Sequence, residues 1–319
     1  MIILFLVACG NSATQQSIAT VPPTQPPIAT VPPTQPPIAT VPPTQQPIAT
    51  VPPAKLTEQK FVSMTGKALA DSLKLMNADG YAVTSFRWAG TGFEAIFSRG
   101  SGLNGQVFSS WPLSQVPAAL KEASAKGYAV TSFIRLIEGT FGEEATYFFV
   151  LSQGSGLQNQ FIIEDISKVP LTVLTETDIK IERFWNFSDV LKEANAQGYA
   201  VTAFDGYRAI FSKGSALNEQ LFINRAEPEQ FAVLTNNTKL DGHAITGFTY
   251  IDGFGGARYN IILSKGSSIT KQVTTTINDG SDMQTDFNTL LADAKDKKQA
   301  VTGFNYIPGF KYLVMLSTY

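Results

Sequence analysis

Side chains that could act as nucleophiles or general bases are scarce in this sequence. The chain of 319 residues contains one cysteine, Cys9, and one histidine, His243. A catalytic Ser–His pair would have to use His243, which stands where related segments carry Tyr81, Tyr128 and Tyr199. We interpret it as a packing variant of those tyrosines. The single cysteine allows no intramolecular disulfide.

Carboxylates are the remaining candidates for acid–base chemistry. Two carboxyl groups about 5–10 Å apart could hydrolyse a glycosidic bond, but that pairing is set by the fold. No His pair, Cys pair or spaced Asp loop indicates a metal site, and residues 279–282 are typical of a turn and helix cap. We therefore expect no metal and no cofactor. The acidic residues expected near loops, each interpreted as a solvated charge, are Glu94, Glu138, Glu143, Glu144 and Asp205.

The residue types that favour ligand binding are aromatic and cationic. Three tryptophans have no counterpart in the repeats described below, and aromatic side chains with a polar tip suit sugar or peptide surfaces. Packing between structural units is the alternative for them. Three cations follow repeated serines and could form a basic rim. The candidate ligand-binding residues are Trp88, Trp111, Trp185, Arg99, Lys213 and Lys265.

These candidates lie on a sequence that repeats five times. The phrase Gly-Tyr-Ala-Val-Thr begins at Gly80, Gly127 and Gly198, and it recurs with substitutions at Gly242 and Lys298. A phenylalanine, an apolar run ending in serine and, in four copies, a Gly-Ser turn and a glutamine follow. Repetition in all copies indicates a structural role, and the polar repeats could line a central channel. They are Thr84, Thr131, Thr202, Thr246 and Thr302, with Ser98, Ser152, Ser212, Ser264 and Ser317.

Each copy predicts one helix and three strands. Residues 117–126 and 188–197 are rich in Ala, Leu, Lys and Glu and predict short helices, each ended by a left-handed glycine. Residues 81–86 predict a β-branched strand, and runs such as 259–264 predict a strand covered on both faces. The glutamines Gln106, Gln160, Gln220 and Gln272 open a third strand. Residues 171–183 predict an insertion in the second copy.

The two ends of the repeat region favour a closed arrangement. The last copy stops at Tyr319 without its third strand, whereas residues 57–61 resemble that strand and precede the first helix. We predict an α+β repeat protein of five βαββ units closed into a propeller-like toroid, in which the strand containing Gln59 completes the last unit. The alternative is an open linear array of the same units, which would need atypical capping repeats.

The pattern Gly-Tyr-x-Val-Thr-Ser, the strand ending in serine and the glutamine-led strand resemble a repeat domain of unknown function. That domain follows the kinase region in some plant casein-kinase-like proteins. The resemblance covers most of residues 57–319, implies the repeat fold and supplies no catalytic residues. The units are also similar in arrangement to pentein-type propeller enzymes, which use a Cys and a His. Residues 55–319 contain no cysteine, so pentein chemistry is not expected.

The first 54 residues contain no charged side chain. Residues 1–9 are apolar and end in Leu-Val-Ala-Cys, which resembles the lipobox of bacterial lipoprotein signal peptides, although a basic segment is missing. We expect two acyl chains on Cys9 to anchor the protein in a membrane. Residues 10–54 repeat a proline-paired decapeptide and predict a disordered linker. Residues 55–319 are the predicted globular domain.

The net charge of −2 gives no long-range field that would attract nucleic acid. Together with the scarcity of catalytic side chains, this predicts a binding module rather than an enzyme. We expect a monomeric, lipid-anchored, extracytoplasmic protein of the cell envelope that binds a glycan or protein ligand. The alternative is a cell-surface hydrolase that uses paired carboxylates.

Overall fold

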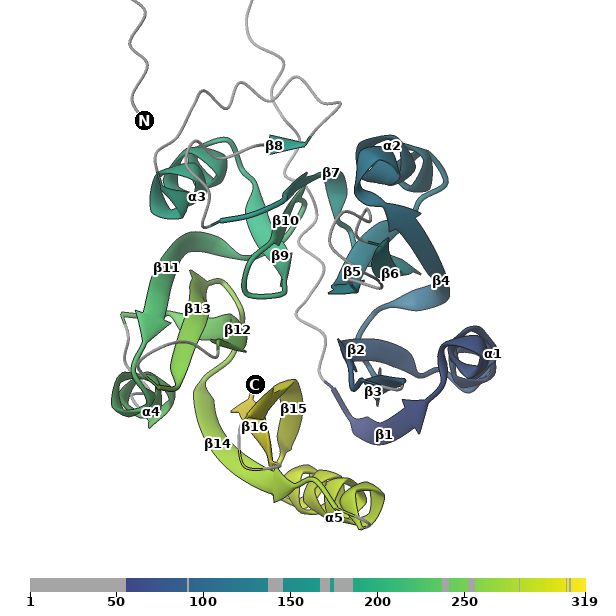
Figure 1. Ribbon diagram of the computed structural model, residues 1–319, viewed down its shortest axis with the longest axis vertical. Helices are drawn as coiled ribbons and strands as arrows, with labels where there is room; N and C mark the ends of the chain where they lie inside the picture. The colour runs from purple at the N-terminus through teal and green to yellow at the C-terminus, as the bar shows by residue number, and fades with distance from the viewer. Residues whose placement is uncertain are drawn as a thin grey trace, which may run out of the picture. The chain divides into compact units, whose positions relative to one another are not determined.

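The computed structural model describes residues 56–319 except 91, 137–145, 167–172, 175–185, 237–240, 252–255, 281, 308 and 310. All of these described residues belong to one compact unit, Gln46–Tyr319. They form five successive modules, each built from a strand, a helix and two further strands (Figure 1).

The modules follow one another along the chain with the same order of elements. The first contains β1 (Glu58–Met64), α1 (Gly66–Ala78), β2 (Ala82–Trp88) and β3 (Phe93–Arg99). The second contains β4 (Asn104–Pro112), the 3₁₀ turn η1 (Leu113–Gln115), α2 (Val116–Ala125), β5 (Ala129–Leu136) and β6 (Thr146–Gln153). The third contains β7 (Gln158–Ile163), β8 (Val173–Leu174), α3 (Phe187–Ala196), β9 (Ala200–Phe204) and β10 (Ala209–Lys213). The fourth contains β11 (Asn218–Ala226), α4 (Pro228–Asn236), β12 (Ala244–Ile251) and β13 (Arg258–Lys265). The fifth contains β14 (Lys271–Asn278), α5 (Met283–Asp296), β15 (Gln299–Ile307) and β16 (Lys311–Thr318).

Each module is a small antiparallel sheet whose last strand lies in the centre. The order is β1-β3-β2 in the first module and β14-β16-β15 in the fifth, and β8 adds a short fourth strand to the third. The two outer strands both run antiparallel to the central one, so they are parallel to each other and the helix connects them. The predicted repetition of small α+β units is confirmed at this level.

The prediction that the strand containing Gln59 completes the last sheet is wrong. β1 pairs with β3 of its own module, from Glu58 opposite Arg99 to Met64 opposite Phe93. In the last sheet, β16 already has β14 on one edge and β15 on the other, so no hydrogen-bonding edge is left for β1. The glutamine-led strand therefore opens a module and does not end one.

The repeated glycine ends the first helix as predicted. Gly80 has φ +77°, its N–H donates to the Asn77 carbonyl, and the Tyr81 N–H donates to the Met76 carbonyl. This is the Schellman arrangement that needs a left-handed residue. The fifth copy places a non-glycine residue there, since Lys298 has φ +55°.

The core is divided into five clusters, and each includes side chains from two modules. The cluster of the second module includes Ile162 and Ile210 of the third, and the cluster of the fourth includes Met315 of the fifth. The cluster of the fifth module includes Phe61 and Ile96 of the first. The central strands supply fully buried residues on both faces, as their apolar runs predicted.

Candidate functional site

The second strand of every module contributes to one cavity of about 210 Å³. Most of its lining comes from β2, β5, β9, β12 and β15, which occupy equivalent places in the five modules, and Asp205, just after β9, and Met315 of β16 complete it. Most of these positions hold the same or similar residues in each copy. The position directly after the repeated phenylalanine does not, and all five of its residues line the cavity. They are Arg87, Ile134, Asp205, Thr249 and Asn305.

The repeated threonine stands at a β-bulge. In the first sheet the pairing shifts between Val83 and Ser85, which leaves Thr84 as the extra residue. Its hydroxyl lies 2.6 Å from the Ser98 hydroxyl, and the same contact occurs in all five modules. Four of the threonines line the cavity: Thr84, Thr131, Thr246 and Thr302. The serines do not, contrary to expectation, because they point into the core and each is 0% exposed.

The repeated glutamine links one module to the next. Gln106 Oε1 accepts a hydrogen bond from the Val83 N–H at 2.6 Å, and Nε2 donates to the Val83 carbonyl at 3.1 Å. Nε2 also donates to Ser152 Oγ at 2.8 Å. Because β2 is the edge strand of its sheet, the side-chain amide supplies the bonds that a neighbouring strand would otherwise make.

The same bonds recur at every junction. Gln160 bonds to Val130, Gln220 to Val201 and Gln272 to Ile245. Gln59 bonds in the same way to the N–H and carbonyl of Val301, at 2.6 and 2.9 Å. The motif found in the sequence is therefore a structural one, and it includes a link between the first and last modules.

Arg87 belongs to a buried polar group at that link. Its Nη1 lies 3.6 Å from Oε2 of Glu94, whose Oε1 accepts a hydrogen bond from the Tyr312 hydroxyl at 2.7 Å. Glu94 is only 2% exposed, so its interpretation as a solvated charge is wrong. Burial raises the pKa of Glu94, while Arg87 and Tyr312 oppose this shift. Burial also lowers the pKa of Arg87.

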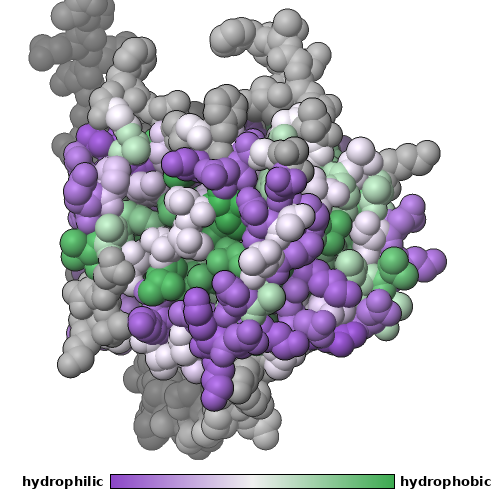
Figure 2. All heavy atoms as spheres, turned by 90° about the horizontal axis from the view of Figure 1, so that it is seen from below, coloured by the Kyte–Doolittle hydropathy of each residue, from purple (hydrophilic) through white to green (hydrophobic). Residues whose placement is uncertain are grey.

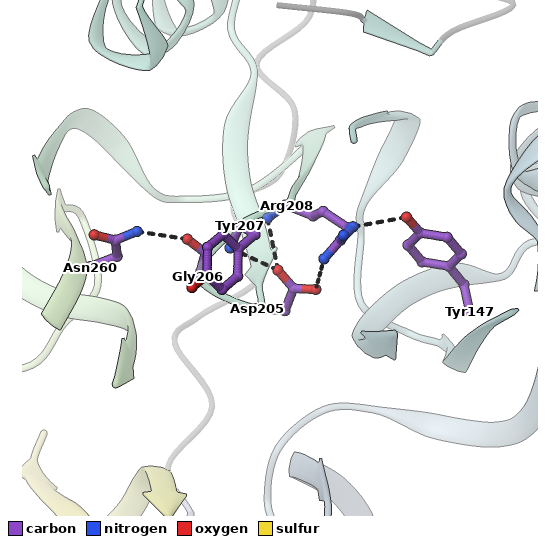
Figure 3. A network of polar contacts seen from close by, with 6 residues as sticks. All are labelled: Tyr147, Asp205, Gly206, Tyr207, Arg208 and Asn260. Carbon is purple, nitrogen blue, oxygen red and sulfur yellow. Dashed lines mark hydrogen bonds and ion pairs between the residues drawn. The ribbon is translucent and has the colours of Figure 1, made fainter. Parts of the chain in front are cut away.

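Asp205 lies in a second polar network (Figure 3). Its Oδ1 accepts hydrogen bonds from the N–H groups of Tyr207 and Arg208, at 2.9 and 2.7 Å, and its Oδ2 lies 3.2 Å from Arg208 Nη1. Arg208 Nε donates to the hydroxyl of Tyr147 in the second module at 2.8 Å. Burial raises the pKa of Asp205, and Arg208 opposes this shift. Asp205 is thus a partly buried ion-pair member and not the solvated charge expected.

The turn that carries Asp205 is tied to both neighbouring modules. On the other side, Asn260 of the fourth module donates its Nδ2 to the Gly206 carbonyl at 2.7 Å (Figure 3). Gly206 has φ +97°, and a Cβ there would lie 2.6 Å from Thr249. The turn that follows Asp205 therefore packs closely against Thr249, another residue that lines the cavity.

Two of the three tryptophans are described, and both pack against aromatic side chains of the core. Trp88 lies edge-on to Phe93 at 4.9 Å between ring centroids, and Trp111 lies 4.8 Å from Phe149. They belong to different clusters, so the structure favours the packing alternative. Trp185 lies outside the described residues.

The three candidate cations make contacts with residues of their own modules. Arg99 lies over the ring of Tyr81 at 4.4 Å and pairs with Glu58. The other two make similar local contacts: Lys213 lies over Tyr199 at 4.6 Å, and Lys265 pairs with Glu219 at 2.7 Å. None of these three cations, nor either described tryptophan, lines the central cavity.

The other candidates give no second site within the described part of the chain. His243 Nε2 lies 2.8 Å from the Glu219 carbonyl oxygen, and the residue does not line the cavity. Residues 56–319, apart from the gaps given above, bring together no group of three His, Cys, Asp or Glu that could hold a metal. Cys9, Glu138, Glu143 and Glu144 lie outside the described residues. No described helix is long and apolar enough to cross a membrane.

Two further cavities adjoin the ends of the second strands. One, of about 310 Å³, shares five lining residues with the central cavity: Thr84, Thr131, Ile245, Thr246 and Thr302. Its other lining residues include Leu103 and Leu217 beside Ser101 and Ser267. The other, of about 250 Å³, lies between β1 and α5 and is lined by Leu56 and Leu291 among others. The face where β1 and α5 lie shows apolar patches between polar side chains (Figure 2).

The sequence contained a usable signal for the cavity-lining residues. They occupy a fixed position in the repeat, directly after the phenylalanine, and they differ in every copy. Variation between copies at this position therefore marks the cavity wall, whereas the described tryptophans, which have no counterparts in other copies, do not line it.

Comparisons with protein-family models, with curated proteins and with solved structures found no match to this chain. The resemblance to the casein-kinase-associated repeat therefore remains a prediction.

Proposed function

We propose that the five modules close into a toroid. Contacts between second strands run from β2 to β5, β9, β12 and β15, and from β15 back to β2. Three interactions between the first and last modules support closure: the bonds of Gln59 to Val301, stacking of Phe61 on Phe287 at 4.0 Å, and the Tyr312–Glu94 hydrogen bond. An open array would leave these groups at its two ends without partners.

We propose that this domain is a binding module and that its ligand, a glycan or a protein segment, contacts the central cavity. The observation that carries this proposal is the variation directly after the repeated phenylalanine. The threonine, serine and glutamine are kept in all copies because they hold the modules together. The residue after the phenylalanine differs from copy to copy, and in three copies it places a polar side chain on the cavity wall in addition to its contacts within the protein: Arg87, Asp205 and Asn305.

The alternative, a hydrolase with paired carboxylates, is less well supported by the geometry. Glu94 and Asp205 are the predicted acids that the structure describes, and each is tied to an arginine of its own module. They share no hydrogen bond with each other. Each carboxylate therefore belongs to a polar group that joins two modules, which favours a binding module over a hydrolase.

A substitution that fills the cavity tests the binding proposal. Ser132 lines the cavity, so Ser132→Phe should abolish binding to a glycan array or to a peptide array. Ser110→Phe is the matched control, because Ser110 lies on an exposed strand position and should leave binding unchanged. Equal binding by both variants, with both folded by circular dichroism, would refute the cavity as the binding site.

We also propose that the protein is an extracytoplasmic lipoprotein of the cell envelope that acts as a monomer. Diacylglycerol on Cys9 would hold it to the membrane, and the proline-paired repeats of residues 10–54 would separate the domain from the surface. Cys9→Ala should move the protein from the membrane fraction to the soluble fraction in cell fractionation. Cys9→Ala protein that still sediments with membranes would contradict the anchor.

A further inference from the structure

We infer that the cavity takes an uncharged sugar ring, of about the size of one monosaccharide. This inference rests on the proposed function and names the ligand class for the same site. It is drawn from the charges, the hydrogen-bonding groups and the size of the cavity wall.

The charges that line the cavity are compensated within the protein. In the first module the cavity-lining residue is the cation Arg87, which lies opposite Glu94 on the neighbouring strand. In the third module the cavity-lining residue is the anion Asp205, which pairs with Arg208. A charged ligand would have to lose its hydration without finding an uncompensated opposite charge, and such burial is unfavourable. The wall therefore selects for ligands without net charge.

The same residues still offer hydrogen-bonding groups. Arg87 lines the cavity, and its Nη1 makes no hydrogen bond in the described structure, since its distance to Glu94 is 3.6 Å. This atom is itself buried, so a ligand would reach it only after the side chain turns toward the cavity. Asn305 uses its Nδ2 for the Phe248 carbonyl, which leaves Oδ1 as an acceptor. Asp205 Oδ2 is a second acceptor, and the Thr249 hydroxyl can act either way. Neutral hydroxyl groups both donate and accept, so they match this set.

The remaining wall and the volume fit a sugar ring better than a larger ligand. Ile134 and the repeated phenylalanines supply apolar surface for the C–H groups of a ring. The cavity of about 210 Å³ is smaller than the roughly 300–1,000 Å³ of pockets for drug-sized molecules. A single ring therefore fits this cavity.

A panel of monosaccharides tests this ligand class on the full chain carrying Cys9→Ala. Glucose, galactose and N-acetylglucosamine are titrated by NMR beside two charged analogues, glucuronate and glucosamine. We expect at least one neutral sugar to bind and the charged analogues to bind at least tenfold more weakly. Thr249→Val should weaken that binding about tenfold, and Thr276→Val, at an exposed strand position, should not change it.

Four results would overturn the inference. Glucuronate or glucosamine binding as well as the neutral sugars would show that the wall does not select against charge. Equal affinity in Thr249→Val and Thr276→Val would place the sugar elsewhere. If no sugar binds but a peptide does so in a Ser132-dependent manner, the ligand class fails and the binding proposal stands. If neither binds, both fail.

Discussion

At the scale of single residues, one pair of positions serves both the cavity and the junctions. The residue after the repeated phenylalanine faces the cavity, as Arg87 and Asp205 do. Glu94, opposite Arg87, forms a hydrogen bond with Tyr312. Arg208, beside Asp205, forms one with Tyr147. In the order of contacts β2, β5, β9, β12, β15 and back to β2, each tyrosine belongs to the preceding module. A change in the cavity wall can therefore be transmitted to a junction.

Glu94 should make stability depend on pH. Its pKa is raised in the folded protein above the ordinary value of 4.5, so the folded state holds the proton more tightly than the unfolded state does. The stabilisation from this proton is complete below that value and is lost as pH rises through the folded pKa. Glu94→Gln mimics the protonated acid and removes this loss.

Urea denaturation at a series of pH values measures this effect. Relative to the unsubstituted protein, Glu94→Gln should become more stable as pH rises from about 4.5 toward neutrality. Glu229→Gln is the control, because Glu229 is exposed on α4. A constant difference between the Glu94→Gln and unsubstituted proteins across this range would show that folding does not raise the pKa of Glu94.

At the scale of elements, the sequence predicted where helices and strands lie along the chain better than it predicted which strands pair. The helix expected at 117–126 is Val116–Ala125, and the apolar run 259–264 lies within β13. Periodicity and glycine position determine such elements locally. Which strand pairs with which depends on the path of the helix that connects them, so the sheet that the glutamine-led strand joins could not be predicted from the sequence. The buried position of Glu94 could not be predicted for a similar reason, since its hydrogen-bond partner Tyr312 lies 218 positions away.

The end of α5 offers a direct test of the helix-ending motif. Lys298 has φ +55°, where the other four copies use glycine, and a left-handed conformation costs a side-chain-bearing residue about 1–2 kcal/mol. Glycine at this position would relieve that cost, but part of the gain in stability is offset because glycine is more flexible in the unfolded chain. Lys298→Gly should therefore increase the free energy of unfolding by about 0.5–1 kcal/mol.

Its neighbour is a matched control. Lys297 has φ −84°, so Lys297→Gly removes no strain and should lower stability. Thermal denaturation of both variants measures the difference. Equal destabilisation by the two glycines would mean that the left-handed position is not strained.

At the scale of the whole molecule, the five sheets are joined by side chains and not by backbone pairing. The sheets remain separate, and a glutamine from each module occupies the polar groups on the edge strand of another. The sequence revealed this glutamine and its missing fifth copy near the N-terminus. It could not reveal that the side chain, rather than the strand, makes the connection.

Hydrogen exchange at the Val301 amide tests the proposed closure most directly. The Val301 N–H donates to Gln59 Oε1, so it should be protected in the unsubstituted protein and exchange at least tenfold faster in Gln59→Met, since a tenfold change corresponds to about 1.4 kcal/mol. Gln106→Met should have the same effect on the Val83 amide and leave Val301 protected. If Val301 exchanges at the same rate with and without Gln59, the first and last modules are not joined and the array is open.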